Sequence, residues 1–165
     1  LNTDIHRELD IIQLNICSLV VLTKLFMQDM ATRGEGKILN LSSIASKSPG
    51  PWHSVYHGTK AFVQSFTEAI REEVKDKGIT VTALLPGATS TDFFKKAEME
   101  SSKVMEEEMA DPADVAEDGY EALMDGKDMI VSGLKNKVQV MMNNITPDDT
   151  AAKKTAKAQE PVSSE

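Results

Sequence analysis

Residues 79–87 read Ile-Thr-Val-Thr-Ala-Leu-Leu-Pro-Gly, and this stretch decides the fold. The first seven residues are β-branched or apolar and carry no charge, which is typical of a strand that is buried on both faces of a sheet. Pro86-Gly87 then ends the strand. Because such a strand needs cover on both faces, the stretch favours an α/β protein with a parallel sheet.

The residues before this strand predict a helix and an earlier strand. Residues 55–77 place apolar side chains at helical spacing and close with Lys75, Lys77 and Gly78, the charge and cap expected at a helix C-terminus. Residues 37–41 read as a short strand that ends in Ser42-Ser43, and residues 44–54 form a loop with two prolines and a glycine.

Residues 5–30 predict a long helix with no Gly or Pro, and Asp4 is available as its cap. Apolar residues cover more than one of its faces, so we expect burial on several sides, either within a layer of the fold or at a subunit contact. The densest apolar run, residues 16–22, contains Cys17 and Ser18 and is followed by Thr23-Lys24. Such a run is short and broken, so we expect no membrane span.

The residues after position 87 complete the pattern. Asp111-Pro112 starts a helix, and residues 129–131 read as a last short strand. Beyond Pro147 almost nothing is available to bury, which predicts a disordered tail. We therefore expect a partial Rossmann-like, doubly wound parallel sheet in three layers (α/β/α) that lacks its N-terminal strands. Residues 1–146 would form a truncated catalytic domain and residues 147–165 the tail.

Composition narrows the classes of partner and compartment. The net charge of −8 argues against non-specific binding to nucleic acid or to anionic membranes. The single cysteine, Cys17, excludes an intrachain disulfide and favours a reducing compartment, so we expect a cytoplasmic protein. No cluster of Cys, His and Asp has metal-ligand spacing, so we expect no metal site.

Tyr56 and Lys60 lie four positions apart at the start of a predicted helix and therefore on one face. A tyrosine has an ordinary pKa near ~10, too high for a general base at neutral pH. A lysine cation at roughly 5 Å in an effective dielectric of about 20 favours the phenolate by about 3 kcal/mol, or two pKa units. The pair alone is a weak signal, because it occurs by chance in many proteins.

Three further features make the signal specific. Ser43 closes a strand 13 residues before Tyr56 (56 − 43), Asn15 lies 28 residues before Ser43 (43 − 15), and Pro86-Gly87 closes the next strand. Together the sequence resembles the short-chain dehydrogenase/reductase family over about residues 5–131. The matching stretches are Leu14-Asn15, Lys37-Ile38-Leu39-Asn40-Leu41-Ser42-Ser43, Tyr56-His57-Gly58-Thr59-Lys60-Ala61 and Pro86-Gly87-Ala88-Thr89-Ser90-Thr91.

The resemblance implies a role for each matching residue in hydride transfer between NAD or NADP and a carbonyl or alcohol substrate. Tyr56 would be the acid/base, Lys60 would lower its pKa and bind the nicotinamide ribose, and Ser43 would hydrogen-bond the substrate oxygen. Asn15 would hold a water that links Lys60 to solvent. Pro86, Gly87 and Thr91 would lie along the nicotinamide. The resemblance also implies a homo-oligomer for a complete chain.

Structural interpretations stand beside these roles. Asn15 alone could be a buried polar residue, Ser42-Ser43 a strand-end turn, and His57 either structural or at the rim of the cleft. Residues 93–109 correspond by position to the family's mobile substrate lid, and their phenylalanines and methionines suggest an apolar substrate. Simple helix packing explains those residues equally well.

The sequence departs from the family in its first half. No Gly-x-x-x-Gly-x-Gly run occurs, so the phosphate anchor of a dinucleotide fold is absent and the choice between NAD and NADP cannot be read. We therefore expect this polypeptide alone to bind cofactor poorly and to be inactive, although a full-length parent would be an enzyme. The alternative is a non-catalytic fragment that persists as a binding or vestigial domain.

Overall fold

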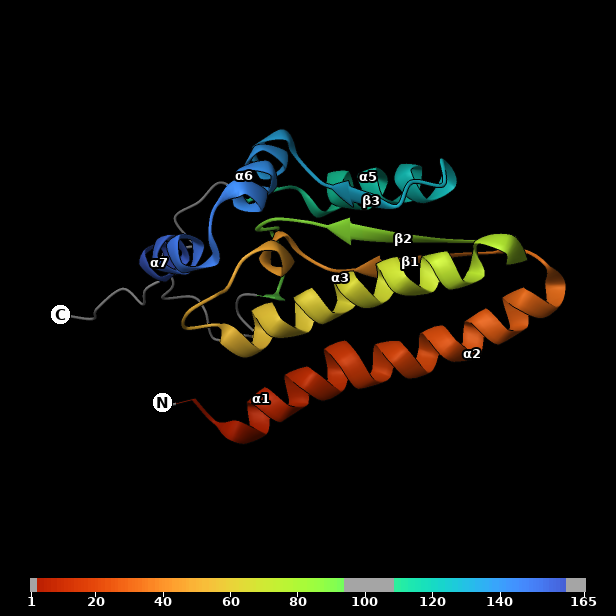
Figure 1. Ribbon diagram of the computed structural model, residues 1–165, viewed down its shortest axis with the longest axis horizontal. Helices are drawn as coiled ribbons and strands as arrows, with labels where there is room; N and C mark the ends of the chain where they lie inside the picture. The colour runs from red at the N-terminus through yellow and green to blue at the C-terminus, as the bar shows by residue number, and fades with distance from the viewer. Residues whose placement is uncertain (1–2, 94–108, 160–165) are drawn as a thin grey trace.

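A parallel sheet with strand order β1-β2-β3 forms the centre of the computed structural model, which describes residues 3–93 and 109–159 (Figure 1). The strands are β1 (Gly36–Leu41), β2 (Ile79–Leu85) and β3 (Met129–Val131). Leu41 is in register with Leu84, and Leu85 with Val131. The carboxyl ends of all three strands therefore meet at one edge of the sheet, as the sequence predicts.

Helices cover both faces of the sheet. On one face α3 (Ser54–Val74) buries Ile70 and Val74 against Val81 of β2. On the other face α5 (Pro112–Met124) comes so close that a β-carbon on Gly119 would lie 2.7 Å from the Leu84 side chain. Successive side chains of β2 point to opposite faces and so pack against both helical layers. The expected three-layer α/β architecture with a partial Rossmann-like sheet is confirmed.

Short helical turns join these elements at two places. Residues Ile44–Lys47 form a 3₁₀ turn after β1, and Lys75–Lys77 form another between α3 and β2. Gly78 ends the second turn with φ 70°, and a β-carbon there would lie 2.0 Å from the carbonyl oxygen of Gly34. Only glycine fits this left-handed position so close to the neighbouring turn.

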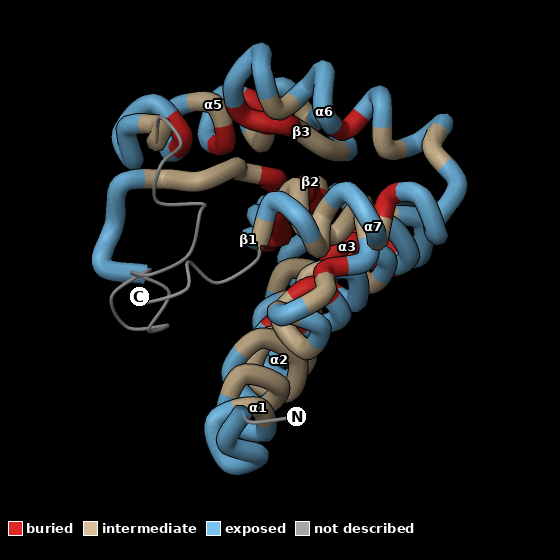
Figure 2. Tube along the Cα trace, turned by 90° about the vertical axis from the view of Figure 1, so that its left-hand side faces the viewer, coloured by how far each residue is buried: buried red, intermediate tan, exposed pale blue. Residues whose placement is uncertain are grey.

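The N-terminal helix runs continuously through α1 (Ile5–Ile12), a π-helical turn (Gln13–Cys17) and α2 (Ser18–Arg33). Asp4 caps it by accepting a hydrogen bond from the His6 amide, as the sequence predicts. Burial on several sides within a layer is not observed: Thr23 is the one buried residue among the described residues of the helix, because α3 covers only one side (Figure 2). The alternative, a subunit contact, stays a prediction. The other sides expose apolar residues such as Val21, Leu25 and Phe26.

The same helix, Ile5–Arg33, passes a length and composition test for a membrane-spanning segment, with 29 residues and a mean hydropathy of 1.7 over its most apolar window. The expectation of no span rested on the densest apolar run, residues 16–22, and did not consider the hydropathy of the whole predicted helix. The result is weak support for a span, because a helix at the N-terminus that packs in a soluble fold passes the same test.

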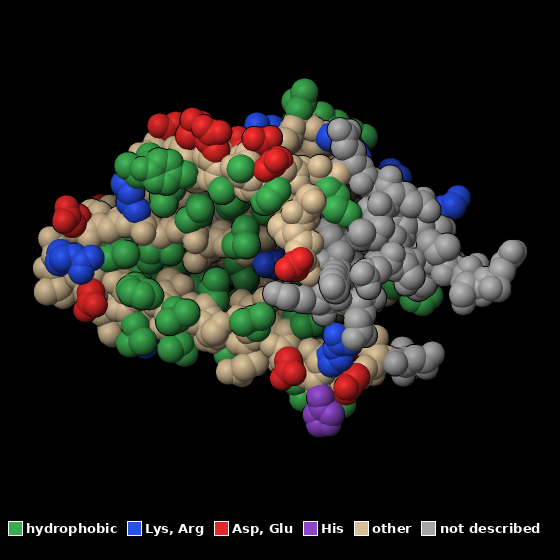
Figure 3. Space-filling view, turned by 180° about the vertical axis from the view of Figure 1, so that it is seen from behind, with side chains coloured by type: hydrophobic (Ala, Val, Ile, Leu, Met, Phe, Trp, Pro, Cys, Tyr) green, Lys and Arg blue, Asp and Glu red, His purple; other side chains and the backbone are tan. Residues whose placement is uncertain are grey.

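The outer edge of β1 has no strand partner among residues 3–93 and 109–159. Leu39 and Leu41 point to the face that α5 only partly covers, and they remain 36% and 53% exposed. Figure 3 shows hydrophobic side chains spread over the back of the molecule between the helical layers. This part of the sheet is apolar and open.

The C-terminal residues form two helices, α6 (Leu134–Ile145) and α7 (Asp148–Gln159). The second differs from the expected disordered tail over residues 148–159. Alanine and lysine favour helix, and the segment docks on the loop before α3: Ala151 is buried, and Trp52 Nε1 donates a 3.2 Å hydrogen bond to the carbonyl oxygen of Ala156. Composition alone did not show these contacts.

Candidate active site

Ser43 joins the carboxyl ends of β1 and β2. Its hydroxyl accepts a 3.1 Å hydrogen bond from the Ala45 amide and donates a 3.4 Å bond to the carbonyl oxygen of Pro86. The Ile44 amide donates to the same carbonyl at 3.0 Å. Two hydrogen bonds to the Pro86 carbonyl thus link the segment after β1 to the turn after β2 at the carboxyl edge of the sheet.

Tyr56 lies in the first turn of α3 and hydrogen-bonds the Ser43 side chain. Burial raises the pKa of the Tyr56 phenol above its ordinary value of 10.0, and the Ser43 hydrogen bond offsets only part of that rise. The structure thus brings these two predicted site residues together. The expected lowering of the pKa is not observed, because the desolvation of the phenolate outweighs the groups that stabilise it.

Lys60 approaches Tyr56 but bonds to the strand. Its Nζ lies 5.8 Å from the centroid of the Tyr56 ring and donates a 3.0 Å hydrogen bond to the carbonyl oxygen of Leu41. Ser42 Oγ, just after β1, donates a hydrogen bond to the backbone carbonyl oxygen of Lys60 at 3.0 Å. Burial also lowers the pKa of Lys60 below its ordinary value.

Asn15 lies in the π-helical turn of the N-terminal helix. π-turns inside α-helices often mark functional positions. Its Nδ2 donates a 3.0 Å hydrogen bond to Thr59 Oγ1, and the Thr59 hydroxyl donates to the carbonyl oxygen of Tyr56 at 2.8 Å. Thr59 was not among the predicted site residues. It lies within the Tyr56–Lys60 motif, and its position three residues after Tyr56 is the signal that could have identified it.

The turn after β2 brings Pro86 and Gly87 to the same edge, whereas Thr91 lies farther along. A β-carbon on Gly87 would lie 2.5 Å from the side-chain amide of Asn136 in α6, so the turn is tightly backed. Thr91 is exposed, and its hydroxyl accepts a 3.3 Å hydrogen bond from the Phe93 amide. Phe93 itself lies 5.5 Å from Tyr56, centroid to centroid. The rest of the expected lid, residues 94–109, lies almost wholly outside the described residues.

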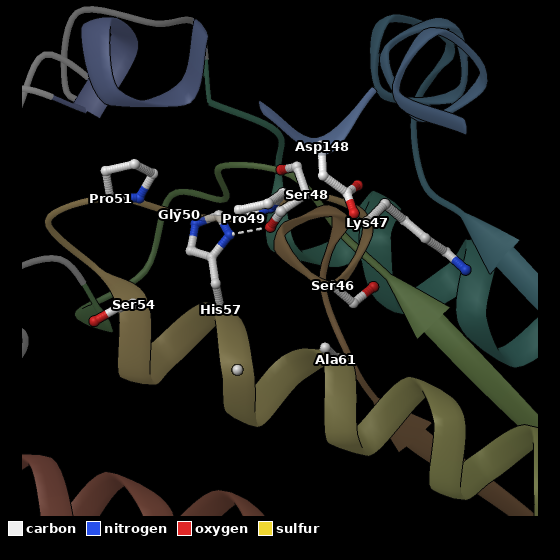
Figure 4. Close-up of a pocket in the computed structure, with 11 residues that line it drawn as sticks. Ser46, Lys47, Ser48, Pro49, Gly50, Pro51, Ser54, His57, Ala61 and Asp148 are labelled. Atoms are coloured by element: carbon white, nitrogen blue, oxygen red, sulfur yellow. Dashed lines mark hydrogen bonds between the residues drawn. The ribbon is translucent and has the colours of Figure 1, made fainter. Parts of the chain in front are cut away.

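His57 follows Tyr56, with its ring centroid 6.1 Å from that of Tyr56, and it faces a cavity of about 640 Å³ (Figure 4). The lining includes Ser48, Gly50 and Asp148 but neither Tyr56 nor Lys60, so it is separate from the Ser43–Tyr56 edge. His57 is buried, its Nδ1 lies 2.8 Å from the carbonyl oxygen of Ser48 and its Nε2 lies 3.0 Å from Gln159 Nε2. These contacts favour the structural interpretation of His57 over a place at the rim of the cleft.

Within residues 3–93 and 109–159 no group of three or more His, Cys, Asp and Glu side chains could hold a metal ion.

The sequence matches the family model described as short chain dehydrogenase over residues 3–102, more than half of the chain. The chain belongs to the short-chain dehydrogenase family. This family assignment agrees with the residues that the Ser43–Tyr56 edge brings together.

Among curated relatives, this short-chain dehydrogenase chain is 39% identical over 98 residues to the 17-beta-hydroxysteroid dehydrogenase type 3 of Mus musculus, covering 59% of the chain and 32% of the relative. It is 40% identical over 85 residues to the very-long-chain 3-oxoacyl-CoA reductase of Rattus norvegicus, covering 52% and 27%. It is 30% identical over 154 residues to dehydrogenase/reductase SDR family member 7B of Danio rerio, covering 89% and 50%. The chain thus spans about a quarter to a half of these relatives.

Solved structures show the same fold. A 7beta-hydroxysteroid dehydrogenase superposes with a TM-score of 0.73 at 24% identity, covering 88% of this short-chain dehydrogenase chain and 57% of the other. A short-chain dehydrogenase from Sphingobium yanoikuyae, solved with NADPH, gives 0.69 at 24% identity, covering 82% and 56%.

Proposed function

We propose that this chain provides the acid–base site of an NAD(P)-dependent oxidoreductase that interconverts a carbonyl compound and an alcohol. The observation that carries the proposal is the hydrogen bond between Ser43 and Tyr56, with Lys60 beside them, at the carboxyl edge of the sheet. In open α/β sheets this edge is the usual place for a ligand. The family assignment and the NADPH-bound relative support the proposal.

In this proposal Ser43 and Tyr56 receive the substrate oxygen between them. Ser43 donates a hydrogen bond that stabilises negative charge as it develops on that oxygen. Because burial raises the pKa of the Tyr56 phenol, this residue holds its proton at neutral pH and can deliver it to the oxygen during carbonyl reduction. Alcohol oxidation needs the opposite transfer, and the phenol is a weak base for it without further help.

The nicotinamide end of the cofactor fits the residues present, whereas the pyrophosphate end has no Gly-rich turn in this sequence. The Lys60 ammonium has three donors, one of which meets the Leu41 carbonyl, and we assign the others to ribose hydroxyls. Pro86 and Gly87 present backbone beside them, and the hydroxyl of Thr91 lies on the same segment. When bound, the cofactor supplies or accepts the hydride.

Asn15 is assigned a positioning part in this proposal. The Asn15 amide donates a hydrogen bond to the Thr59 hydroxyl, which donates one to the Tyr56 carbonyl oxygen. Through these two bonds the N-terminal helix positions the first turn of α3, which carries Tyr56. The resemblance also implies that Asn15 holds a water toward Lys60.

A steroid or a long acyl chain is the substrate class we propose. Relatives of this chain are named for hydroxysteroids and for very-long-chain 3-oxoacyl-CoA. The Phe93 ring against Tyr56 supports an apolar approach to the reacting carbon.

The test is oxidation and reduction of such substrates, followed by nicotinamide absorbance, with this chain and with a form extended upstream of Leu1. Tyr56→Phe should remove most turnover in the active form and leave NADPH affinity within about twofold, because only the proton donor is lost. Tyr120→Phe, at the other tyrosine and exposed on α5, is the matched control. Unchanged turnover in Tyr56→Phe would refute the assignment.

A non-catalytic binding module is the second candidate, favoured by the absence of a Gly-rich run from this sequence. Thermal-shift titrations with NADH and NADPH distinguish the two. Binding and turnover only in the extended form support the oxidoreductase, and the absence of both in every form supports the module.

We also propose that a complete chain forms a homo-oligomer through the N-terminal helix. Val21, Leu25 and Phe26 are more than half exposed on α2, and such an apolar face calls for cover. The molar mass of a complete chain, measured by light scattering, should be that of an oligomer. Leu25→Gln/Phe26→Gln in the same chain should lower this mass toward that of the monomer.

A further inference from the structure

Helix α6 presents its apolar side chains to solvent. Five residues recur at helical spacing on the outward face and are between 52% and 78% exposed: Leu134, Val138, Met141, Met142 and Ile145. We call these five residues the α6 stripe. An ordinary surface helix turns such a stripe toward the core, so this orientation needs a cause.

The orientation of α6 is fixed from its inner side. Val140 is 4% exposed and packs in a cluster with Ala83, Leu85 and Val131 of the sheet. Asn136 donates a 2.7 Å hydrogen bond to the carbonyl oxygen of Ser132. The helix therefore cannot roll to bury the stripe without losing this packing. Figure 2 shows α6 at the outside of the molecule, largely exposed along its length.

The charges beside the stripe are all positive. Lys135 and Lys137 flank it and no carboxylate lies between residues 134 and 145, in a chain whose net charge is −8. The nearest acids along the chain are Asp128, which pairs with Arg71, and Asp148, which lines the cavity that His57 faces. The net charge predicts repulsion from anionic surfaces, but charges farther than about 10 Å are screened at physiological salt, so the local pattern dominates.

We propose that the α6 stripe docks on an anionic lipid surface. A 12-residue helix is about 18 Å long, too short to span a bilayer, so it would lie in the plane of the headgroups with its apolar face inward. The lysine stems reach back to the phosphates. A second copy fits less well, because α6 offers no carboxylate to meet the lysines of another α6.

Docking of this kind would place the candidate active site beside the membrane. Asn136 of α6 lies against Gly87, in the turn that forms one wall of the Ser43–Tyr56 edge. Figure 1 shows α6 at the end of the molecule toward which β2 points. The inference itself depends on the stripe and the lysines, and not on the proposed chemistry.

The test is flotation of the full chain with vesicles of phosphatidylcholine alone and of phosphatidylcholine with phosphatidylserine. The parent should bind the anionic vesicles. Val138→Gln/Met141→Gln/Ile145→Gln should lower the bound-to-free ratio by at least about tenfold, and Lys135→Gln/Lys137→Gln should lower it by about tenfold or more on the anionic vesicles alone. Tyr120→Gln/Met124→Gln, exposed apolar positions on α5, should bind like the parent.

Two outcomes would overturn the proposal. Equal binding by the parent and the stripe variant would assign any lipid contact to another surface, such as α2. A parent dimer that the stripe variant abolishes, without vesicle binding, would assign the stripe to a second copy. Tyr56→Phe should float like the parent, so a failed oxidoreductase assignment and a failed lipid assignment remain distinguishable. Thermal unfolding of each variant checks that it folds, as expected for exposed positions.

Discussion

The side-chain amide of Asn15 donates a 3.0 Å hydrogen bond to the hydroxyl of Thr59, which lies 44 positions later in the chain. This bond joins the π-helical turn of the N-terminal helix to the first turns of α3, directly behind Tyr56. It is the most specific tie between the N-terminal helix and the candidate active site.

Removing this tie should destabilise the chain. Asn15→Ala and Thr59→Ala should each lower the free energy of unfolding by about 1–2 kcal/mol, since each leaves a partly buried polar partner unsatisfied. In urea denaturation the double variant should lose less free energy of unfolding than the two single variants lose together. The difference, which is the coupling energy, should be about 1 kcal/mol. Strict additivity would show that the hydrogen bond does not form in solution.

Tyr56 should ionise late. The sequence has two tyrosines, so Tyr120→Phe leaves Tyr56 as the single phenol, and its ionisation can be followed by ultraviolet absorbance. Because burial raises its pKa, the midpoint should lie above 10.0, and Ser43→Ala should raise it further by removing the hydrogen bond that lowers it. A midpoint below 10.0 that does not change in Ser43→Ala would instead indicate that the Lys60 charge determines the pKa of the Tyr56 phenol.

The stability that Tyr56 contributes should disappear in alkali. A pKa raised on folding means that the folded chain holds the proton more tightly, so the contribution is complete below pH 10.0 and is lost as the pH rises through the folded value. Chemical denaturation of the parent and of Tyr56→Phe across this range should show the difference between them shrinking with pH. Burial lowers the pKa of Lys60, so its contribution to the free energy of unfolding increases with pH, opposite to that of Tyr56. Lys60 is present in both proteins, so its contribution cancels in the comparison.

Docking of α7 should weaken in acid. Burial lowers the pKa of His57 below 6.5, with a further lowering by His53, against the raising effect of its bond to the Ser48 carbonyl. Neutral His57 accepts from Gln159, whose Oε1 lies 3.2 Å from His53 Nδ1. The unfolded chain takes up the proton first, so stability is complete above pH 6.5 and falls as the pH drops below it.

The one tryptophan, Trp52, reports this change because its indole bonds to Ala156 of α7. Its fluorescence should shift as the pH falls below 6.5. Gln159→Leu should abolish the shift. Asp148 and Lys47 line the same cavity, and a shift that persists in Gln159→Leu but vanishes in Asp148→Asn would transfer the effect to that carboxylate.

Two glycines should respond oppositely to alanine. A β-carbon on Gly50 would lie 2.0 Å from the buried His57 ring, so Gly50→Ala should destabilise the chain by about 1–3 kcal/mol. A β-carbon on Gly58, within α3, would meet nothing within 4 Å, so Gly58→Ala should stabilise it by about 0.5–1 kcal/mol through helix propensity. Thermal unfolding of the pair measures both, and equal shifts would contradict the packing around His57.

The elements and the meeting of Ser43 with Tyr56 could be predicted from sequence because they depend on local pattern. Strand ends and the first turn of a helix are marked by the residues that form them, and parallel strands bring their carboxyl ends together. The partner of Asn15 and the docking of Gln159 on His57, 102 positions away, depend on long-range packing that no local pattern encodes. The direction of the Tyr56 pKa needed its burial, which spacing does not give.

The bare edge of β1 has a practical consequence for handling the chain. No strand of the described residues pairs with this edge, and Leu39 and Leu41 are exposed beside it, so it is a template on which an extended backbone can add. Purified alone, the polypeptide should aggregate through this strand, and chaperones should retain it in cells. The yield of monodisperse protein should therefore depend on whether another segment of backbone pairs with the outer edge of β1.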